Sequence, residues 1–177
     1  MKPAIFLDRD GTLIEDRGHL GSLNEVYFYP ETIPALKKLR NTFELIIITH
    51  QPGVASGLIT MDQVDIVNSH VSGVLHEAGI AIRETYVCPH DRLEDCICIK
   101  PKPFFLLRAA KDYGLDLKRS FSIGDHPADV ELARNLGGTG IFLLTGHGEK
   151  HHHELKADDI VVPGIGEAVE YILASLD

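Results

Sequence analysis

The sequence lacks the features that mark a membrane, secreted or nucleic-acid-binding protein. It has no tryptophan, only 3 cysteines, and 17 Lys and Arg against 26 Asp and Glu. No apolar run approaches the roughly 20 residues that cross a bilayer, and a strand begins too early for a secretory signal. The net charge of -9 disfavours non-specific attraction to nucleic acid or an anionic membrane. We therefore expect a cytoplasmic protein that binds neither.

The composition is that of a folded chain, with 44% hydrophobic residues and no low-complexity tract. A length of 177 residues suits one domain with a full core and is short for two. We expect a single domain over residues 1–177, and a monomer.

Short apolar runs alternate with amphipathic stretches, which predicts strand–helix units around a mainly parallel sheet. The expected fold is α/β, a Rossmann-like three-layer sandwich. Strands are predicted at 4–7, 45–49, 84–87, 120–123, 140–144 and 160–161. Helices are predicted at 32–40, 61–78, 103–113, 127–136 and 165–176. Thr60 and Gln63 form a capping-box pattern at the second helix.

Asp8 and Asp10 directly follow the first predicted strand, and Gly11 comes next. Side chains two residues apart project to the same side of an extended chain, so both carboxylates can face one ligand. This layout indicates phosphoryl transfer, with Asp8 attacking a phosphate monoester and Asp10 moving the protons. The simpler interpretation is a turn, because Asp-Gly is a common turn sequence. We expect the Thr12 hydroxyl to brace that turn.

Two more carboxylates follow the fourth predicted strand. Asp125 ends the strand, and Asp129 lies one helical turn later. Several carboxylates and a phosphate repel one another, so a divalent cation is needed, and oxygen ligands favour Mg²⁺. We assign Asp125 to the metal and Asp129 to a supporting role. The alternative is that Asp125 caps the helix that opens at Pro127.

Groups suited to phosphate oxygens follow two other segments. The second strand ends at Thr49, and His50 and Gln51 precede a Pro-Gly pair, so a hydroxyl and free backbone N–H groups should lie there. Lys100 offers a cation for the transferring phosphoryl group. Lys102 is the competing lysine and is interpreted as a surface side chain. Ligands of open parallel sheets bind outside the carboxyl ends of the strands, where all these candidates fall.

All three cysteines lie within residues 88–98. Cys88, His90, Cys96 and Cys98 form a complete tetrahedral donor set for Zn²⁺. Four protein ligands leave no position for water, so we interpret this zinc as structural. It would pin a loop that ends two residues before the candidate lysine. The alternative is three reduced surface thiols beside a chance histidine.

A histidine-rich stretch comprises His147 and residues 151–153. It could bind a metal, but we interpret it as a solvated connection after the last main strand. Its internal position excludes a terminal purification tag.

Together these segments resemble the four sequence motifs of the haloacid dehalogenase-like superfamily of aspartate-nucleophile phosphatases. The motif residues are Asp8 to Thr12, Thr49, Lys100 and Gly124–Asp125. The zinc loop resembles the subfamily that holds D-glycero-D-manno-heptose 1,7-bisphosphate phosphatase and histidinol-phosphate phosphatase. The resemblance runs from about Ile5 to Gly146 and implies a compact fold without a large cap domain.

The resemblance also implies residue roles. Mg²⁺ would be held by Asp8, the backbone carbonyl of Asp10, and Asp125. Asp8 would be the nucleophile and Asp10 the acid and base, with Thr49 and Lys100 stabilising the phosphoryl group. The segment from Asp16 matches a substrate-facing loop. The expected substrate-binding residues are Asp16, Arg17, Gly18, His19, His50 and Gln51.

The chain departs from the family pattern at four positions. The family usually has Thr-Asn-Gln-Ser-Gly where this chain has residues 49–53, and an Arg where this chain has Ile99. In the heptose enzymes an Arg also tends to occupy the position of Ser56. Loss of two cations should weaken recognition of a second phosphate on the substrate.

The leading expectation is a Mg²⁺-dependent phosphatase of a small phosphorylated metabolite, a heptose bisphosphate-like sugar phosphate. The runner-up substrate is histidinol phosphate. Only five residues separate His90 from Cys96, and this short spacing resembles that of the histidinol-phosphate enzymes. A zinc-stabilised binding protein without catalysis is the alternative of another class. A phosphatase of nucleic-acid ends is disfavoured by the acidic balance.

Overall fold

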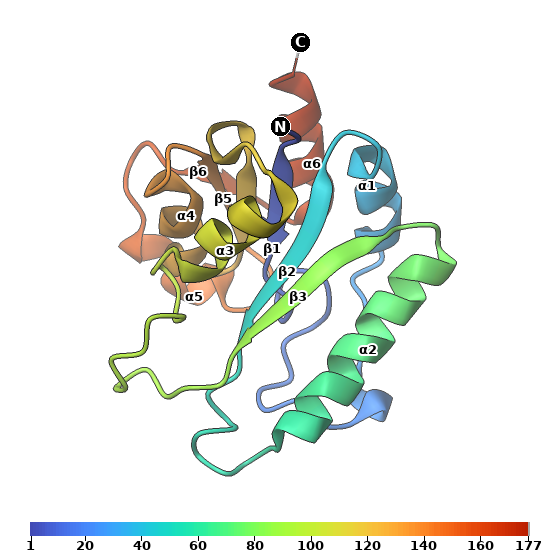
Figure 1. Cartoon of the computed structure of the whole chain (residues 1–177), viewed down its shortest axis with the longest axis vertical. Coiled ribbons are helices and arrows are strands. Elements are labelled where there is room, and N and C mark those ends of the chain that lie inside the picture. The colour runs from blue at the N-terminus through green and yellow to red at the C-terminus, as the bar shows by residue number, and fades with distance from the viewer. Residues whose placement is uncertain (177) are drawn as a thin grey trace.

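The computed structural model describes residues 1–176, and Asp177 lies outside the described part of the chain. Within it, strands in the order β3-β2-β1-β4-β5-β6 form a six-stranded sheet, and every neighbouring pair is parallel (Figure 1). The strands are β1 (Ala4–Leu7), β2 (Glu44–His50), β3 (Ile82–Cys88), β4 (Phe121–Gly124), β5 (Thr139–Leu143) and β6 (Ile160–Val162).

Helices connect the strands in the alternation that the sequence predicted. They are α1 (Thr32–Leu39), α2 (Met61–Glu77), α3 (Phe104–Tyr113), α4 (Pro127–Arg134), α5 (Gly148–His151) and α6 (Ile165–Ala174), with short 3-10 turns at Leu23–Glu25, Leu117–Arg119 and His152–Glu154. Every predicted strand and helix is present, with ends within two residues of the prediction. The predicted three-layer α/β fold is confirmed.

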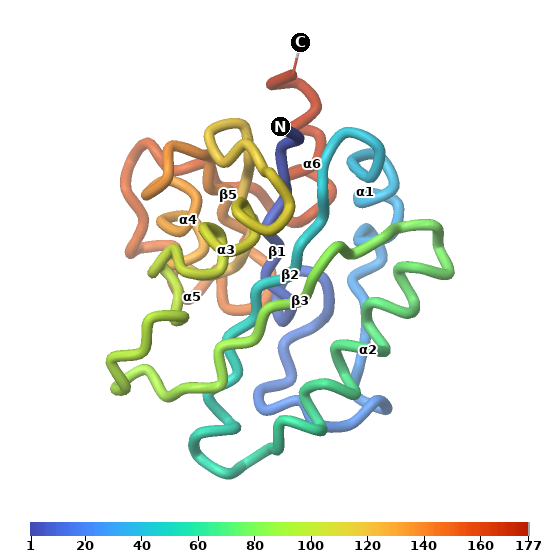
Figure 2. The backbone as a smooth tube through the Cα atoms, viewed as in Figure 1, coloured from blue at the N-terminus to red at the C-terminus, as the bar shows by residue number. Residues whose placement is uncertain are grey.

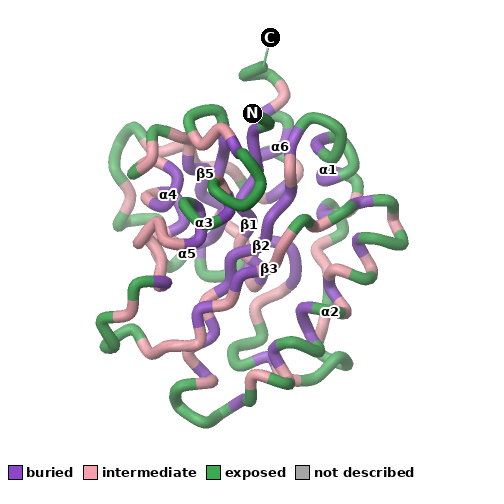
Figure 3. The backbone as a smooth tube through the Cα atoms, viewed as in Figure 1, coloured by how far each residue is buried: buried purple, intermediate pink, exposed green. Residues whose placement is uncertain are grey.

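Alternation along the buried strands divides the core into two layers. Ile5 and Leu7 of β1 pack with α1, α2 and α6, whereas Phe6 faces the opposite layer with α3 and α4. The same alternation continues in β2. Buried segments run along the centre of the sheet and exposed ones along the outer helices and loops (Figure 3). Within residues 1–176, no helix is both long enough and apolar enough to cross a membrane.

Local sequence signals explain where the longest helix begins and ends. The Thr60 side chain accepts a hydrogen bond from Gln63 N at 3.2 Å, and Thr60 N donates to Gln63 Oε1 at 2.9 Å, which is the predicted capping box. After α2, Gly79 has a φ of 79°, a left-handed conformation that glycine adopts without a steric penalty.

The strand order places a topological switch point between β1 and β4, because the chain moves outward from β1 in both directions. In such sheets the crevice outside the carboxyl ends at this point binds ligands. The loops that follow β1, β2 and β3 all leave from this edge (Figure 2). In the described structure the segments that follow these strands, residues 8–31, 51–60 and 89–103, contain turns, isolated bridges and one 3-10 turn. None of them forms a large cap domain, as predicted.

Candidate active site

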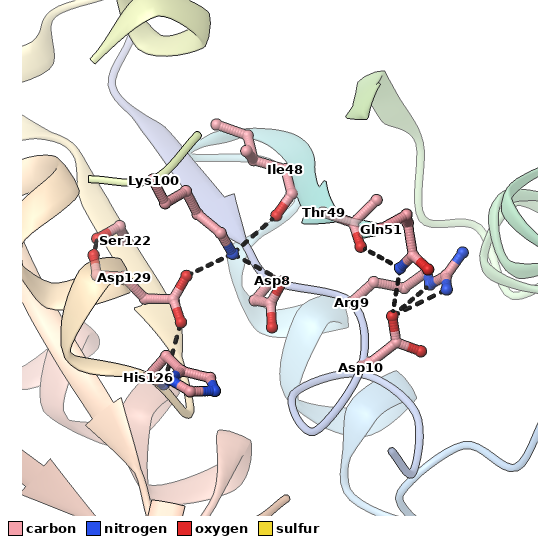
Figure 4. A network of polar contacts seen from close by, with 10 residues as sticks. All are labelled: Asp8, Arg9, Asp10, Ile48, Thr49, Gln51, Lys100, Ser122, His126 and Asp129. Atoms are coloured by element: carbon pink, nitrogen blue, oxygen red, sulfur yellow. Dashed lines mark hydrogen bonds and ion pairs between the residues drawn. The ribbon is translucent and has the colours of Figure 1, made fainter. Parts of the chain in front are cut away.

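Lys100 lies between two carboxylates from different parts of the chain, Asp8 directly after β1 and Asp129 in the first turn of α4. Its Nζ donates to Asp8 Oδ1 at 2.8 Å and to Asp129 Oδ1 at 2.6 Å, and a third bond reaches the carbonyl of Ile48 at 3.2 Å (Figure 4). Burial alone would lower the pKa of Lys100, but the carboxylates of Asp129 and Asp8 outweigh it and raise the pKa. The lysine therefore stays charged beside Asp8.

A second hydrogen-bond network, separate from the one around Lys100, holds Asp10. Arg9 Nε donates to Asp10 Oδ2 at 3.0 Å, and Gln51 Nε2 donates to the same oxygen at 2.8 Å. Arg9 is fully buried, and its Nη1 donates to Asn68 Oδ1 of α2 at 2.7 Å. Burial raises the pKa of Asp10 although the Arg9 charge opposes the change.

The other oxygen of Asp10 is not committed to a hydrogen bond in the described part of the chain. Asp10 Oδ1 is buried and has no hydrogen-bond partner within residues 1–176. A raised pKa and an uncommitted oxygen suit a carboxyl that gives and takes a proton. Thr12 does not brace the turn as predicted, because its buried hydroxyl has no partner in the described structure. The backbone instead closes the turn, with Leu13 N donating to the Arg9 carbonyl at 2.9 Å.

Asp125 does not cap α4, so that alternative is wrong. The cap residue is His126, whose N donates to Asp129 Oδ2 at 3.1 Å. Asp125 Oδ2 accepts from His147 N at 2.7 Å. Its carboxylate is wedged between two glycines, since a Cβ at either Gly11 or Gly146 would lie 2.2 Å from Asp125 Oδ2. Distant chain segments thus enclose this one side chain.

The carboxylates of Asp8, Asp125 and Asp129 offer oxygens within 4.8 Å of one another. Burial, followed by the charges of Asp8 and Asp129, raises the pKa of Asp125 to about 8. A clustered all-oxygen donor set of this kind fits Mg²⁺, which would favour the ionised carboxylates. Both oxygens of Asp129 are already bonded, to Lys100 and to His126. Asp8 and Asp125 therefore remain as the side chains suited to the ion.

A second donor cluster lies in the loop after β3. The Sγ atom of Cys98 is 3.1 Å from that of Cys88 and 3.8 Å from that of Cys96, and His90 Nδ1 lies 3.3 Å from Cys98 Sγ. All three cysteines are free. Donors around a tetrahedral zinc ion would lie about 3.3–3.8 Å apart. The four side chains fit Zn²⁺, in agreement with the predicted donor set.

A pocket of about 310 Å³ opens at the carboxyl edge of the sheet. It brings together most of the residues that the sequence singled out. Its lining includes Asp8, Asp10, Asp16, Gly18, His19, His50, Gln51, Lys100, Asp125 and Asp129.

Apart from the four candidate zinc ligands, two predicted site residues lie outside this lining. Arg17 donates to Glu15 Oε2 at 2.6 Å and lies over the Tyr27 ring, 4.8 Å from its centroid. Thr49 is 1% exposed, and its Oγ1 accepts from Gln51 Nε2 at 2.7 Å. Ser56 is exposed and bonds the backbone of its own turn.

Several residues for which no role was predicted lie at the site in the structure. Arg9 and Asn68 orient Asp10, and Arg92 and His126 line the pocket. A role for Arg9 could have been predicted from the sequence. An arginine between two strand-end carboxylates projects to the side opposite those carboxylates and needs a buried partner there.

Part of the histidine-rich stretch belongs to the pocket region. His147 lines the pocket, and its Nε2 lies 3.0 Å from Asp16 Oδ2. His151 lies against His126, with ring centroids 4.3 Å apart. These two residues are therefore packed against the site, unlike the solvated connection that the sequence predicted, whereas His152 and His153 are exposed.

Fold and site together define a doubly wound α/β protein with an acid- and lysine-lined pocket at its switch point. A HAD-hydrolase-like family model matches residues 97–168. The chain is 36% identical over 137 residues to a D-glycero-β-D-manno-heptose-1,7-bisphosphate 7-phosphatase of Pasteurella multocida, covering 73% of this chain and 74% of that one. The chain belongs to the HAD-like hydrolase family, as its sequence motifs indicated.

Two further relatives bear on its function. The chain is 35% identical over 141 residues to the histidine biosynthesis bifunctional protein HisB of Campylobacter jejuni, covering 77% of this chain and 40% of that protein. It thus spans about two fifths of that relative's length. The crystal structure of D,D-heptose 1,7-bisphosphate phosphatase from B. bronchiseptica, complexed with magnesium and phosphate, has a TM-score of 0.88 and 26% identity, covering 99% of each chain.

Proposed function

We propose that this protein is a Mg²⁺-dependent phosphatase of a small sugar phosphate, with a heptose 1,7-bisphosphate as the leading substrate. The observation that carries the proposal is the pairing of Asp8 with the buried Lys100 cation at 2.8 Å, with Asp10 lining the same pocket. The heptose bisphosphate phosphatases among its relatives support the substrate class. Residues 1–177 would form a single catalytic domain.

In the first step Asp8 attacks phosphorus, a bond forms between its carboxylate oxygen and phosphorus, and the bond to the leaving oxygen breaks. Asp10 gives its proton to that leaving oxygen. The ammonium of Lys100, already beside Asp8, offsets negative charge on the transferring group. Asp129 keeps Lys100 in place.

In the second step water attacks the aspartyl-phosphate, and Asp10 accepts a proton from that water. Asp8 is released together with inorganic phosphate. Gln51 and Arg9 hold one oxygen of Asp10, which leaves Oδ1 to move the proton in both steps. Thr49 would act in the same region through Gln51, because its hydroxyl oxygen accepts a hydrogen bond from the Gln51 side-chain amide.

Asp8, Asp125 and the backbone carbonyl of Asp10 would hold the Mg²⁺ ion. When bound, it supplies positive charge that offsets the clustered carboxylates and the substrate phosphate. Cys88, His90, Cys96 and Cys98 would hold a structural Zn²⁺ that fixes the loop before Lys100.

A second candidate substrate is histidinol phosphate. The match to the bifunctional histidine biosynthesis protein favours it. The short spacing between His90 and Cys96 is in accord with that choice. A substrate panel with and without Mg²⁺ tests both candidates by phosphate release. Turnover of histidinol phosphate alone would contradict the sugar phosphate proposal, and absence of Mg²⁺-dependent phosphate release from every substrate would contradict the phosphatase itself.

A further inference from the structure

The pocket lining contains more carboxyl groups than permanent cations. Five carboxylates line it, together with four histidines and two permanent cations, Arg92 and Lys100. Lys100 is committed, because Asp8 and Asp129 both accept its hydrogen bonds. Among the residues that line the pocket, Arg92 is therefore the permanent cation left for any anionic group of a substrate beyond the phosphate at Asp8.

Arg92 is free to do so. It lies in the loop between His90 and Cys96, it is exposed, and among the described residues its side chain has no hydrogen-bond or ion-pair partner. The charge of Arg92 acts on other residues that line the pocket. Burial lowers the pKa of both His50 and His126, and the Arg92 charge adds to that lowering, after His151 in the case of His126. The guanidinium fork is also the side chain best shaped to bind a phosphate through two hydrogen bonds.

We propose that Arg92 binds a second anionic group of the substrate, distal to the phosphate at Asp8, and so selects a sugar bisphosphate over the monophosphate. This inference rests on the proposed function, since it assumes that a phosphate occupies the pocket beside Asp8. It assigns the loop of residues 88–98 a direct part in substrate choice, in addition to its expected structural zinc. Ile99, which lines the pocket without a charge, cannot take that part.

The test compares D-glycero-D-manno-heptose 1,7-bisphosphate with the matching 7-monophosphate, which lacks only the distal group. Arg92→Gln should lower the ratio of kcat/KM between the two substrates about 10- to 100-fold, mainly through KM for the bisphosphate. Arg92→Lys should retain part of the preference. Arg119→Gln is the matched control, because Arg119 is an exposed arginine outside the pocket lining, and it should leave the ratio unchanged.

An unchanged ratio in Arg92→Gln, or an equal loss on both substrates, would overturn the inference. A calorimetric titration separates this failure from failure of the proposed function. It uses Asp8→Asn protein with Mg²⁺, with and without Arg92→Gln, and measures the Kd of each sugar phosphate. A selective loss of bisphosphate affinity supports the role of Arg92 even if the parent releases no phosphate. Equal affinities in the two proteins refute that role even if the parent is an active phosphatase.

Discussion

Lys100 Nζ donates a hydrogen bond to Asp8 Oδ1 at 2.8 Å across a sequence separation of 92 residues. Asp8 leaves the central strand β1, whereas Lys100 follows the loop that contains the candidate zinc ligands. The proposed nucleophile and its cation are thus positioned by separate parts of the chain. Each part can be perturbed independently, which makes the proposed mechanism open to dissection.

Replacement of the proposed nucleophile should abolish turnover while leaving the fold intact. Asp8→Asn keeps the shape of the side chain and one accepting oxygen but cannot form the aspartyl-phosphate. We expect phosphate release to fall by at least about 10³-fold, with an unchanged circular dichroism spectrum. Equal phosphate release by the variant and the parent would refute the assignment of Asp8.

Loss of the buried cation should affect both activity and stability. Lys100→Met leaves Asp8 and Asp129 without their shared partner, and an uncompensated buried charge costs about 3–5 kcal/mol. We expect a lower free energy of unfolding and a fall in kcat of about 10²–10³, measured by denaturant titration and steady-state kinetics. Lys102→Met is the control, because Lys102 bonds Asp95 at the surface. Similar kcat losses in the two variants would contradict the proposal.

The acidic cluster should make the stability of the metal-free protein depend on pH. The pKa of Asp125 is raised to about 8 in the folded state, whereas an unfolded Asp titrates near pH 4. Between these values the folded state binds more protons than the unfolded state, so stability falls as pH rises. In the presence of a chelator, we expect Tm to fall as the pH rises from 5 to 8.5. Added Mg²⁺ should restore Tm most at the high end of this pH range.

Asp125→Asn provides the control for this pH dependence. The variant has no carboxyl to titrate at position 125, so its Tm in chelator should change less over the same pH range. It should also gain little from Mg²⁺. A parent protein whose Tm rises with pH in chelator would contradict the proposed role of the cluster.

The effect of losing zinc should be separable from the Mg²⁺ dependence of activity. Protein purified without a metal-affinity step should contain one tightly held zinc per chain by elemental analysis. Cys98→Ser should lose that zinc and lower the Tm, because the loop before Lys100 loses its anchor. Residual activity should still require Mg²⁺. Parent protein that contains no zinc would refute the site, and a Cys98→Ser variant that retains it would exclude Cys98 as a ligand.

Much of the fold could be predicted from local sequence. Buried parallel strands read as apolar runs such as residues 45–48, and the capping pattern of Thr60 marks a helix start, so both were visible without tertiary information. Carboxyl ends of parallel strands meet at one edge, which brought Asp8, Asp125 and most other candidates together correctly.

The parts that could not be predicted depend on contacts between distant segments. Thr12 and Arg17 were assigned by position in a motif, but the Arg17 side chain finds Glu15 and Tyr27 as nearer partners. The bond between Arg9 and Asn68 joins the segment after β1 to α2 across 59 residues. Only the packing of α2 decides which of its polar side chains reaches the sheet.

The close packing of two glycines against the Asp125 carboxylate restricts which residues can replace them. Gly11 and Gly146 both have positive φ values, and a Cβ on either would collide with the same carboxylate. Neither position can be rescued by repacking a neighbour, because the obstacle is the side chain that the site needs. In a library covering every single substitution, positions 11 and 146 should tolerate glycine alone, and no second-site change that preserves Asp125 should relax that requirement.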